Sequence, residues 1–509
     1  MKIKNLIKEY FVLISMLLLP IFIFAQHRKS QVITDKVELA KLKAAVEASP
    51  DSLSTHKAYT EALGTENPEL EKQYARWMNK FPKSAMVPYG LAKIYLSEEN
   101  PKAKPYLLKA VEIDPKFTEA WAGLWQDGER WGDFIQSRAY LQKAAESDPN
   151  NPNYAFYYAS SFSGVDQGKW IEMSLDVAKR FPKHERGAQA LYWLAERSTK
   201  TADKIKYYDL LHDSYPPSRF GWSASGMSSY YNLLLKENPK KAIALAQEMA
   251  KNENDEDRTW RDRLPESKRI ADAKELMSQN KGDEALAILN SLKLQKYSRF
   301  GTDLAILKAE ASDLAGRTNA AYVSLIVTFA KAPSVALKTA IGAYAEKLGK
   351  NLAQADSDIR NYLKANRPMA TPFNGLKRYL TEEKASLSDF KGKVVLLTYW
   401  FPGCGPCRGE FPHFENVVKK FETDDLAYIG INIVSKQNSY VVPFMKASGY
   451  SFTPLEEIDD RDKGNLDNQG FAPMNFLIDR EGRLMFANFR TDANNEEDLE
   501  LMIKFLCEQ

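Results

Sequence analysis

The sequence predicts a multidomain protein in which an all-α helical solenoid is followed by an α/β domain. Prolines recur at a nearly constant spacing through the first half of the chain. After a segment with two prolines, residues 367–372, short apolar runs alternate with helical patterns around a Cys-x-x-Cys motif. Repeated helix pairs and alternating strands and helices are typical of a solenoid and an α/β domain. A length of 509 residues leaves room for two or three domains.

The first 25 residues have the pattern of a secretory signal peptide. Three lysines precede an apolar stretch over residues 10–24, and Ala25 offers a small residue for cleavage. An uncleaved anchor is the alternative, but the stretch is short for the ~20 residues of a membrane span. Because no cysteine lies near Ala25, the pattern does not fit a bacterial lipoprotein. We therefore expect a soluble protein exported to the periplasm.

Composition narrows the classes of partner. The formal net charge is +3, which gives no reason to expect nucleic acid or an anionic membrane. Three cysteines in an exported chain cannot form a disulfide framework. Two of them share one short motif, which favours a working disulfide over a structural one.

The region before residue 367 repeats. Six prolines are separated by 32 to 34 residues: Pro50, Pro82, Pro115, Pro149, Pro182 and Pro216. A helix pair every ~34 residues with a proline at the turn is the tetratricopeptide pattern. The array resembles tetratricopeptide repeats, and Ala103, Ala110 and Pro115 match the small and turn positions. We expect a helical solenoid over residues 34–364.

Such a solenoid presents an extended concave surface that usually binds proteins or peptides. We therefore expect a protein partner on the helices, with a spacer or a dimerisation platform as the alternative. The aromatic stretch over residues 220–231 is more typical of packing between repeats than of a binding groove. The charged run over residues 252–262 is predicted to be a solvated loop.

Residues 367–509 predict the α/β domain. Two prolines in residues 367–372 interrupt the helical pattern. Period and composition then predict, in order, a buried strand at 394–397, a helix at 410–421, a strand at 427–433, a helix near 440–448, a strand at Pro473, a strand at 484–489 and a helix at 499–506. Lead-in strands within 373–384 are implied only by the family resemblance described below.

The motif Cys404-Gly405-Pro406-Cys407 lies where a predicted buried strand turns into a predicted helix. Free N–H groups and the dipole at a helix N-terminus favour an anion, so a thiolate is stabilised there. Cys404, nearer the helix start and expected to be more exposed, is the predicted nucleophile with a lowered pKa, and Cys407 is the predicted resolving thiol. The pair indicates thiol–disulfide chemistry.

Other interpretations of Cys-x-x-Cys fit less well. Zinc needs two further ligands, but the third cysteine is Cys507 and the five histidines lack ligand spacing. Haem attachment requires a histidine where Arg408 stands. A structural disulfide would close only a tiny loop and constrain almost nothing. We expect no metal and no cofactor, and Cys507 is predicted to be a buried packing thiol.

Residues 387–397, Trp400 and the motif itself resemble the thioredoxin-like disulfide reductases of the TlpA/ResA type, and the similarity continues through residues 470–479 and 481–482. This resemblance covers the chain from Arg367 onward and implies a thioredoxin fold. It also implies that Pro473 is cis and faces the disulfide, where it would hold a substrate backbone. The implied substrate-binding residues are Trp400, Pro406, Ala472 and Pro473.

The chain departs from these families at two positions that could accept a proton. Thioredoxin has a buried aspartate where Thr398 stands, and some relatives have a glutamate where Ser435 falls. From its pattern Glu410 is expected to be too exposed to replace them. The proton acceptor for Cys407 is therefore not predicted.

Taken together, the sequence predicts a periplasmic disulfide reductase that acts on protein disulfides. Gly-Pro between the cysteines resembles strongly reducing thioredoxins, and the family resemblance implies a membrane electron donor. The alternative is a non-catalytic interaction protein whose redox domain senses redox state or docks partners. A peroxiredoxin-type peroxidase needs a threonine-and-cysteine site that the sequence lacks.

Overall fold

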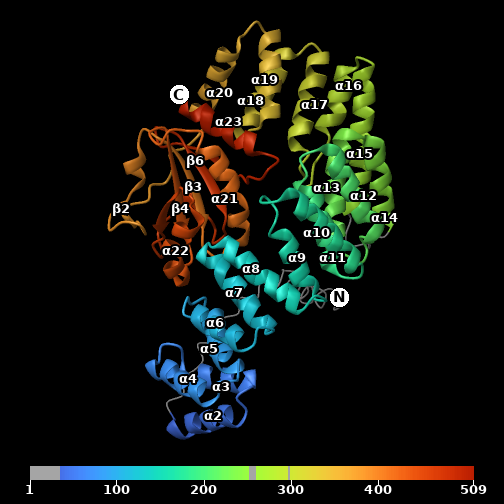
Figure 1. The fold of residues 1–509 in the computed structure, drawn as a ribbon. Helices are drawn as coiled ribbons and strands as arrows, with labels where there is room; N and C mark the ends of the chain where they lie inside the picture. Colours follow the sequence, from blue (N-terminus) through green and yellow to red (C-terminus); the bar gives the residue numbers. More distant parts are fainter. Residues whose placement is uncertain (1–34, 252–258, 296–297, 509) are drawn as a thin grey trace, which may run out of the picture. The chain divides into compact units, whose positions relative to one another are not determined.

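The computed structural model describes residues 35–251, 259–295 and 298–508 (Figure 1). The chain divides into two compact units between residues 123 and 124. The predicted signal peptide lies outside the described residues. None of the described helices is long and apolar enough to cross a membrane.

The first unit is helical. Its helices are α2 (Lys36–Ala48), α3 (Leu53–Leu63), α4 (Pro68–Lys80), α5 (Met86–Ser97) and α6 (Ala103–Ile113), and α7 (Thr118–Trp131) continues into the second unit. Local sequence fixes several helix starts. Asn67 accepts a hydrogen bond from the Glu69 amide at 3.0 Å, and Pro68 occupies the first turn of α4, where no amide hydrogen is needed.

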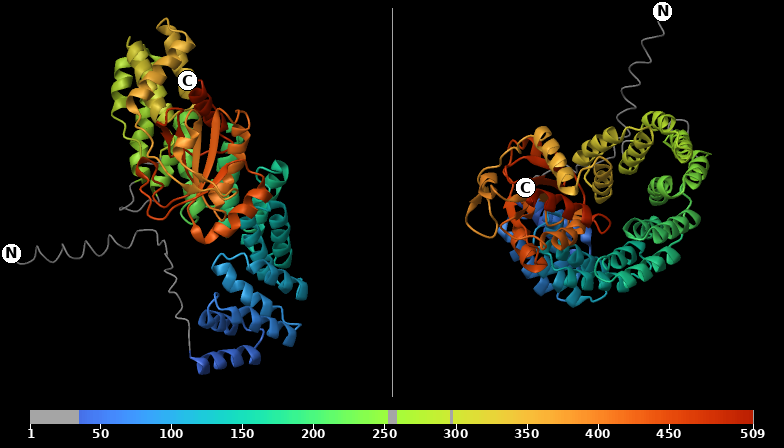
Figure 2. Two further views of the ribbon diagram at one scale, coloured as in Figure 1. Left: turned by 90° about the vertical axis from the view of Figure 1, so that its left-hand side faces the viewer. Right: turned by 90° about the horizontal axis from the view of Figure 1, so that it is seen from above.

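The second unit begins with a long helical region. Its helices are α8 (Phe134–Ser147), α9 (Pro152–Ser160), α10 (Gln167–Arg180), α11 (Glu185–Arg197), α12 (Thr201–Ser214), α13 (Gly221–Glu237), α14 (Pro239–Lys251), α15 (Thr259–Ser278), α16 (Gly282–Asn290), α17 (Gly301–Leu314), α18 (Thr318–Lys331), α19 (Val335–Lys347) and α20 (Leu352–Asn366). Figure 2 shows successive helices of this region lying against one another. The predicted helical architecture is confirmed.

The six recurring prolines lie in turns between helices, as the spacing predicts. Tyr230 and Tyr231 are buried in the helical core, which confirms that the aromatic stretch packs between helices. One expectation is wrong: α15 begins at Thr259, so the charged run does not extend as a loop to residue 262. Trp260 is buried there and stacks edge-on against Tyr231 at 5.8 Å, which favours the helix. Whether the helices are tetratricopeptide repeats stays a prediction.

The C-terminal part of the second unit is built on a five-stranded sheet. The strand order is β5-β4-β3-β6-β7, with β3 parallel to β4 and antiparallel to β6. The strands are β3 (Val394–Trp400), β4 (Leu426–Asn432), β5 (Thr453–Glu456), β6 (Met474–Ile478) and β7 (Leu484–Ala487). The central strand β3 is buried along its whole length. Parallel and antiparallel pairs in one sheet, with helices between strands, confirm the predicted α/β class.

Alternate residues of β3 enter two separate cores, because side chains of a strand point to opposite faces. Leu396 and Trp400 pack with the helices α21 (Gly405–Val418), α22 (Asn438–Ser448) and α23 (Glu496–Cys507). Leu397 and Tyr399 pack on the other face of the sheet. Their partners there include residues from the first part of the α/β domain, which carries the short strands β1 (Leu376–Lys377) and β2 (Lys384–Ala385).

Most predicted helices and strands of this domain are present, but several begin or end a few residues away from the predicted positions. The predicted strand at 394–397 extends to Trp400, and the helix predicted from Glu410 begins five residues earlier, at Gly405. Strand β5 is absent from the prediction, because its four residues include a proline and show no alternation. These elements bring the end of β3 and the start of α21 together at the Cys-x-x-Cys motif.

The helical region of the second unit also packs against the α/β domain. Phe329 of α18 lies 6.1 Å from Phe505 of α23, measured between ring centroids. The Val335 amide donates to Asp498 at 2.7 Å. Both parts share one hydrophobic core, so the α/β domain is not an independent module on a free linker.

Candidate active site

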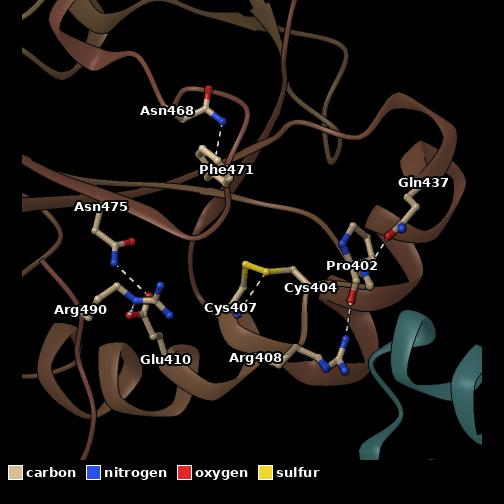
Figure 3. The surroundings of a disulfide bond; sticks show 11 residues. Pro402, Cys404, Cys407, Arg408, Glu410, Gln437, Asn468, Phe471, Asn475 and Arg490 are labelled. Carbon is tan, nitrogen blue, oxygen red and sulfur yellow. Dashed lines mark hydrogen bonds and ion pairs between the residues drawn. A yellow bond between two sulfur atoms is a disulfide. The ribbon is translucent and has the colours of Figure 1, made fainter. Parts of the chain in front are cut away.

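Cys404 and Cys407 form a disulfide at the N-terminus of α21, directly beyond the end of β3 (Figure 3). Their Cα atoms are 5.3 Å apart. Cys404 is the N-cap residue, and its Sγ accepts a hydrogen bond from the Cys407 amide at 3.2 Å. Pro406 occupies the first turn, where its missing N–H costs no helix hydrogen bond. The sulfur predicted to become a thiolate therefore lies where helix amides stabilise negative charge.

The two cysteines differ little in exposure. Cys404 is 2% exposed and Cys407 is 0% exposed in this oxidised form. Cys404 is therefore the more exposed of the two cysteines, as expected, although the difference is small. Their roles as nucleophile and resolving thiol stay predictions.

Trp400, the last residue of β3, packs in the hydrophobic core next to the active-site helix. Its side chain is 0% exposed and packs edge-on against Phe411 and Phe452, with ring centroids 5.7 and 4.8 Å away. In this oxidised form the ring therefore has a packing role in the aromatic core. The assignment of Trp400 to substrate binding stays a prediction.

The Ala472–Pro473 peptide bond is cis, as the family resemblance implies. Pro473 is buried and Ala472 is half-buried, while Pro406 is exposed at the start of α21. The assignment of these three residues to substrate binding stays a prediction. Next to them lies Phe471, which no local pattern in the sequence singled out and which is 59% exposed. Asn468 holds that segment by donating to the Phe471 carbonyl at 2.8 Å (Figure 3).

Gln437 holds the loop between β3 and Cys404. Its Oε1 accepts a hydrogen bond from the Gly403 amide at 2.7 Å, and its side chain is buried. A Cβ at Gly403 would lie 2.9 Å from Gln437 Nε2, so a larger residue there would displace the Gln437 amide group. No local pattern in the sequence pointed to Gln437.

Glu410 is 3% exposed, so the expectation that it is an exposed side chain is wrong. Its carboxylate forms an ion pair with Arg490, accepts from Asn475 Nδ2 at 2.9 Å and accepts from the Thr491 amide at 3.2 Å. Burial raises the pKa of Glu410, and Arg490 and the hydrogen bonds only partly oppose this effect. Helical spacing could have found it, because Glu410 follows Cys407 by three residues and therefore shares its side of the helix.

Neither of the two positions at which an acidic residue was considered, Thr398 and Ser435, provides a carboxyl group in this chain. Thr398 is fully buried in β3, and its Oγ1 has no hydrogen-bond partner among the described residues. Ser435 begins a short 3₁₀ helix, η2 (Ser435–Gln437). Glu410 is thus the buried carboxyl group nearest in sequence to Cys407.

Cys507 lies at the other end of the sheet. Its Sγ is 3.9 Å from the carbonyl oxygen of Asp425, the residue before the start of β4. Burial raises its pKa to about 11, so the thiol is neutral and weakly nucleophilic at physiological pH. It is half-buried, less than predicted, and packs against the core. Among the described residues no three His, Cys, Asp or Glu side chains are grouped as a metal site.

A cleft of about 640 Å³ opens beside the loop that precedes Cys404. Phe401, Val434 and residues 457–464 line it, together with Asn468 and Gly470 from the segment before the cis proline. Asp459, Asp460 and Asp462 are exposed, whereas Arg461 turns inward and donates to Glu457 and Tyr399. The cleft therefore joins the two loops that flank the disulfide.

A Cys-x-x-Cys disulfide between a strand and a helix, in a domain with a cis proline directly before β6, defines a thiol–disulfide oxidoreductase domain of the thioredoxin fold. The Redoxin family matches residues 364–502. The thiol-disulfide oxidoreductase ResA of Bacillus subtilis is 35% identical over 105 residues, which cover 20% of this chain and 56% of ResA. The thioredoxin-like protein YneN of the same organism is 32% identical over 122 residues, which cover 24% of this chain and 71% of YneN.

A solved thiol:disulfide interchange protein of the thioredoxin family from Chlorobium tepidum is 21% identical. It covers 28% of this chain and 97% of its own, with a TM-score of 0.25. Among the sequence relatives, this chain spans little more than half the length of the Bacillus subtilis ResA. Through its C-terminal domain, the chain belongs to the Redoxin family of thioredoxin-like proteins, and that domain is ResA-like.

Proposed function

We propose that this protein is a periplasmic thiol–disulfide oxidoreductase that reduces disulfide bonds of protein substrates. The observation that carries the proposal is the Cys404–Cys407 disulfide at the N-terminus of α21. Such a pair exchanges two electrons with another thiol–disulfide pair without any cofactor. The lysine-rich apolar N-terminus of the sequence supports export to the periplasm.

In the reduced protein, the Cys404 thiolate attacks one sulfur of the substrate disulfide. That bond breaks, a mixed disulfide forms, and the other substrate sulfur leaves as a thiolate that takes a proton. Cys407 then loses its proton and attacks Cys404, which restores the Cys404–Cys407 disulfide and releases the second substrate thiol. The protein is oxidised by two electrons in this cycle, so a reductant must restore the dithiol, and we assign that role to a dithiol donor at the membrane.

Glu410 is the group that we assign to accept the proton of Cys407. It shares the buried side of α21 with Cys407, one helical turn away. Its raised pKa brings a carboxylate closer to the pKa of a thiol, which favours proton transfer between them. Arg490 and Asn475 fix the orientation of the carboxylate.

The cleft beside Phe401 and the exposed Phe471 are the surfaces that we assign to the substrate segment next to its disulfide. The helical region would bind the remainder of a protein substrate, in the manner of tetratricopeptide arrays. Helix pairs with prolines at their turns support that assignment.

The test is a Cys407→Ala variant, which can form the mixed disulfide but cannot resolve it. Incubated in reduced form with a periplasmic extract, it should accumulate disulfide-linked adducts through Cys404. A Cys404→Ala variant is the matched control and should trap none. Absence of adducts with Cys407→Ala would favour the alternative, in which the domain docks or senses and does not catalyse.

A further inference from the structure

We propose that Glu129, on helix α7 of the helical region, sets the reduction potential of the Cys404–Cys407 pair by neutralising Arg408. Glu129 would be a positioning and charge-compensating residue, and the helical region would thus form part of the redox centre. The inference rests on the proposed thiol–disulfide function and names a regulator of that same site.

Arg408 places a positive charge at the start of α21, the helix that begins directly after Cys404. It directly follows Cys407, and its Nη1 donates to the Pro402 carbonyl at 3.0 Å (Figure 3). Its Nη2 lies 3.9 Å from the position that a Cβ on Gly405 would occupy. The guanidinium therefore lies against the first turn of α21, next to the residue that follows Cys404.

Glu129 supplies the opposite charge. Its Oε2 lies 2.9 Å from Arg408 Nη2, and the two side chains are 25% and 18% exposed. Its Oε1 accepts a hydrogen bond from Ser137 Oγ at 2.5 Å, which orients the carboxylate. A partly buried pair with this geometry is screened less by solvent than a surface pair.

The C-terminal part of α7 and the residues that join it to α8 are held in place by contacts with α22. Asp127 accepts a hydrogen bond from the Tyr440 hydroxyl at 2.7 Å. Gly132 approaches so closely that a Cβ there would lie 2.7 Å from the Phe444 carbonyl oxygen, and its φ of +73° also favours glycine. The rings of Phe134 and Phe444 are 6.0 Å apart. This docking fixes Glu129 opposite Arg408.

The charge balance bears on the redox equilibrium because a thiolate exists only in the reduced state. A nearby cation stabilises the thiolate and makes the pair a weaker reductant. When Glu129 neutralises Arg408, that stabilisation is reduced and the dithiol remains a stronger reductant. The helical region would thereby favour the reducing direction that we propose for the domain.

The experiment measures the reduction potential of the full-length protein in glutathione buffers between pH 6 and pH 9. Glu129→Gln removes the charge and keeps a hydrogen-bond acceptor. We expect the equilibrium constant to shift about fivefold toward the dithiol at the alkaline end, which corresponds to about +20 mV. The shift should shrink toward pH 6, where less thiolate is present. Glu129→Asp, which keeps the charge, should stay near the wild type.

Arg408→Gln should shift the potential in the opposite direction, because it leaves the charge of Glu129 uncompensated. The double variant should return close to the wild-type value. Glu496→Gln is the matched control: it removes a carboxylate that contacts the same helix through His413 and Asn416, beyond Arg408, and should leave the potential unchanged.

An unchanged potential in Glu129→Gln, or a shift of the same sign in Glu129→Gln and Arg408→Gln, would overturn the inference. A wild-type pair that exchanges no electrons with glutathione would instead overturn the proposed function. The two failures are therefore distinguishable in one set of measurements.

Discussion

Glu410→Gln is the substitution that tests the assigned proton acceptor most directly. The glutamine has nearly the same shape and can still accept from Arg490 and the Thr491 amide, but it cannot accept the proton of Cys407. The first step, attack by Cys404 on the substrate, should proceed at the wild-type rate. The second step, attack by Cys407 on the mixed disulfide, should slow.

The structure sets the size of this effect. An unassisted thiol has a pKa of ~8.5, so only a few per cent of it is thiolate at pH 7. General bases contribute 10² to 10⁴-fold, and Glu410 is partly committed to three hydrogen-bonding partners. We therefore expect resolution to slow by about 10²-fold at pH 7, and the loss to diminish above pH ~8.5.

The assay follows the decay of the mixed disulfide by rapid acid quenching and gel separation across pH 6 to pH 10. Glu415→Gln is the matched control, because Glu415 lies on the same helix and its carboxylate accepts hydrogen bonds from the amide and hydroxyl of Ser451. A Glu410→Gln variant with the wild-type rate and pH profile of resolution would refute the role of Glu410 as proton acceptor.

Three further outcomes follow from the site. Trp400→Ala removes a fully buried ring and should lower the free energy of unfolding by about 3–5 kcal/mol in urea titrations; a loss below 1 kcal/mol would contradict the packing role. Phe471→Ala should change stability by no more than about 0.5 kcal/mol but slow the reduction of protein disulfides, while a small disulfide reacts as before. Because the folded-state pKa of Glu410 is raised, its protonated form is favoured on folding, so its contribution to stability falls as pH rises through that pKa. In thermal melts, the stability of Glu410→Gln relative to the wild type should therefore increase as pH rises through the pKa of Glu410. A stability difference that does not change with pH would contradict the raised pKa.

The sequence by itself determined the elements that depend on local patterns. The apolar run before Cys404 and the helical period after it located the disulfide between a strand and a helix. The segment around Pro473 predicted the cis bond through its family resemblance. Proline spacing placed the helix turns of the N-terminal region. The strand, the helix and the turns depend on residues close in sequence, where period and turn chemistry act directly, whereas the cis bond rests on the family resemblance alone.

Only the tertiary structure decided which distant residues surround the disulfide. Glu410 is buried because Arg490 and Asn475 from other elements enclose it, and no local pattern contains that contact. The hydrogen bond between Asp127 and Tyr440 joins residues 313 positions apart, and the same docking brings Glu129 to Arg408. Burial and charge compensation arise from packing between elements, so a pattern read along one element cannot reveal them.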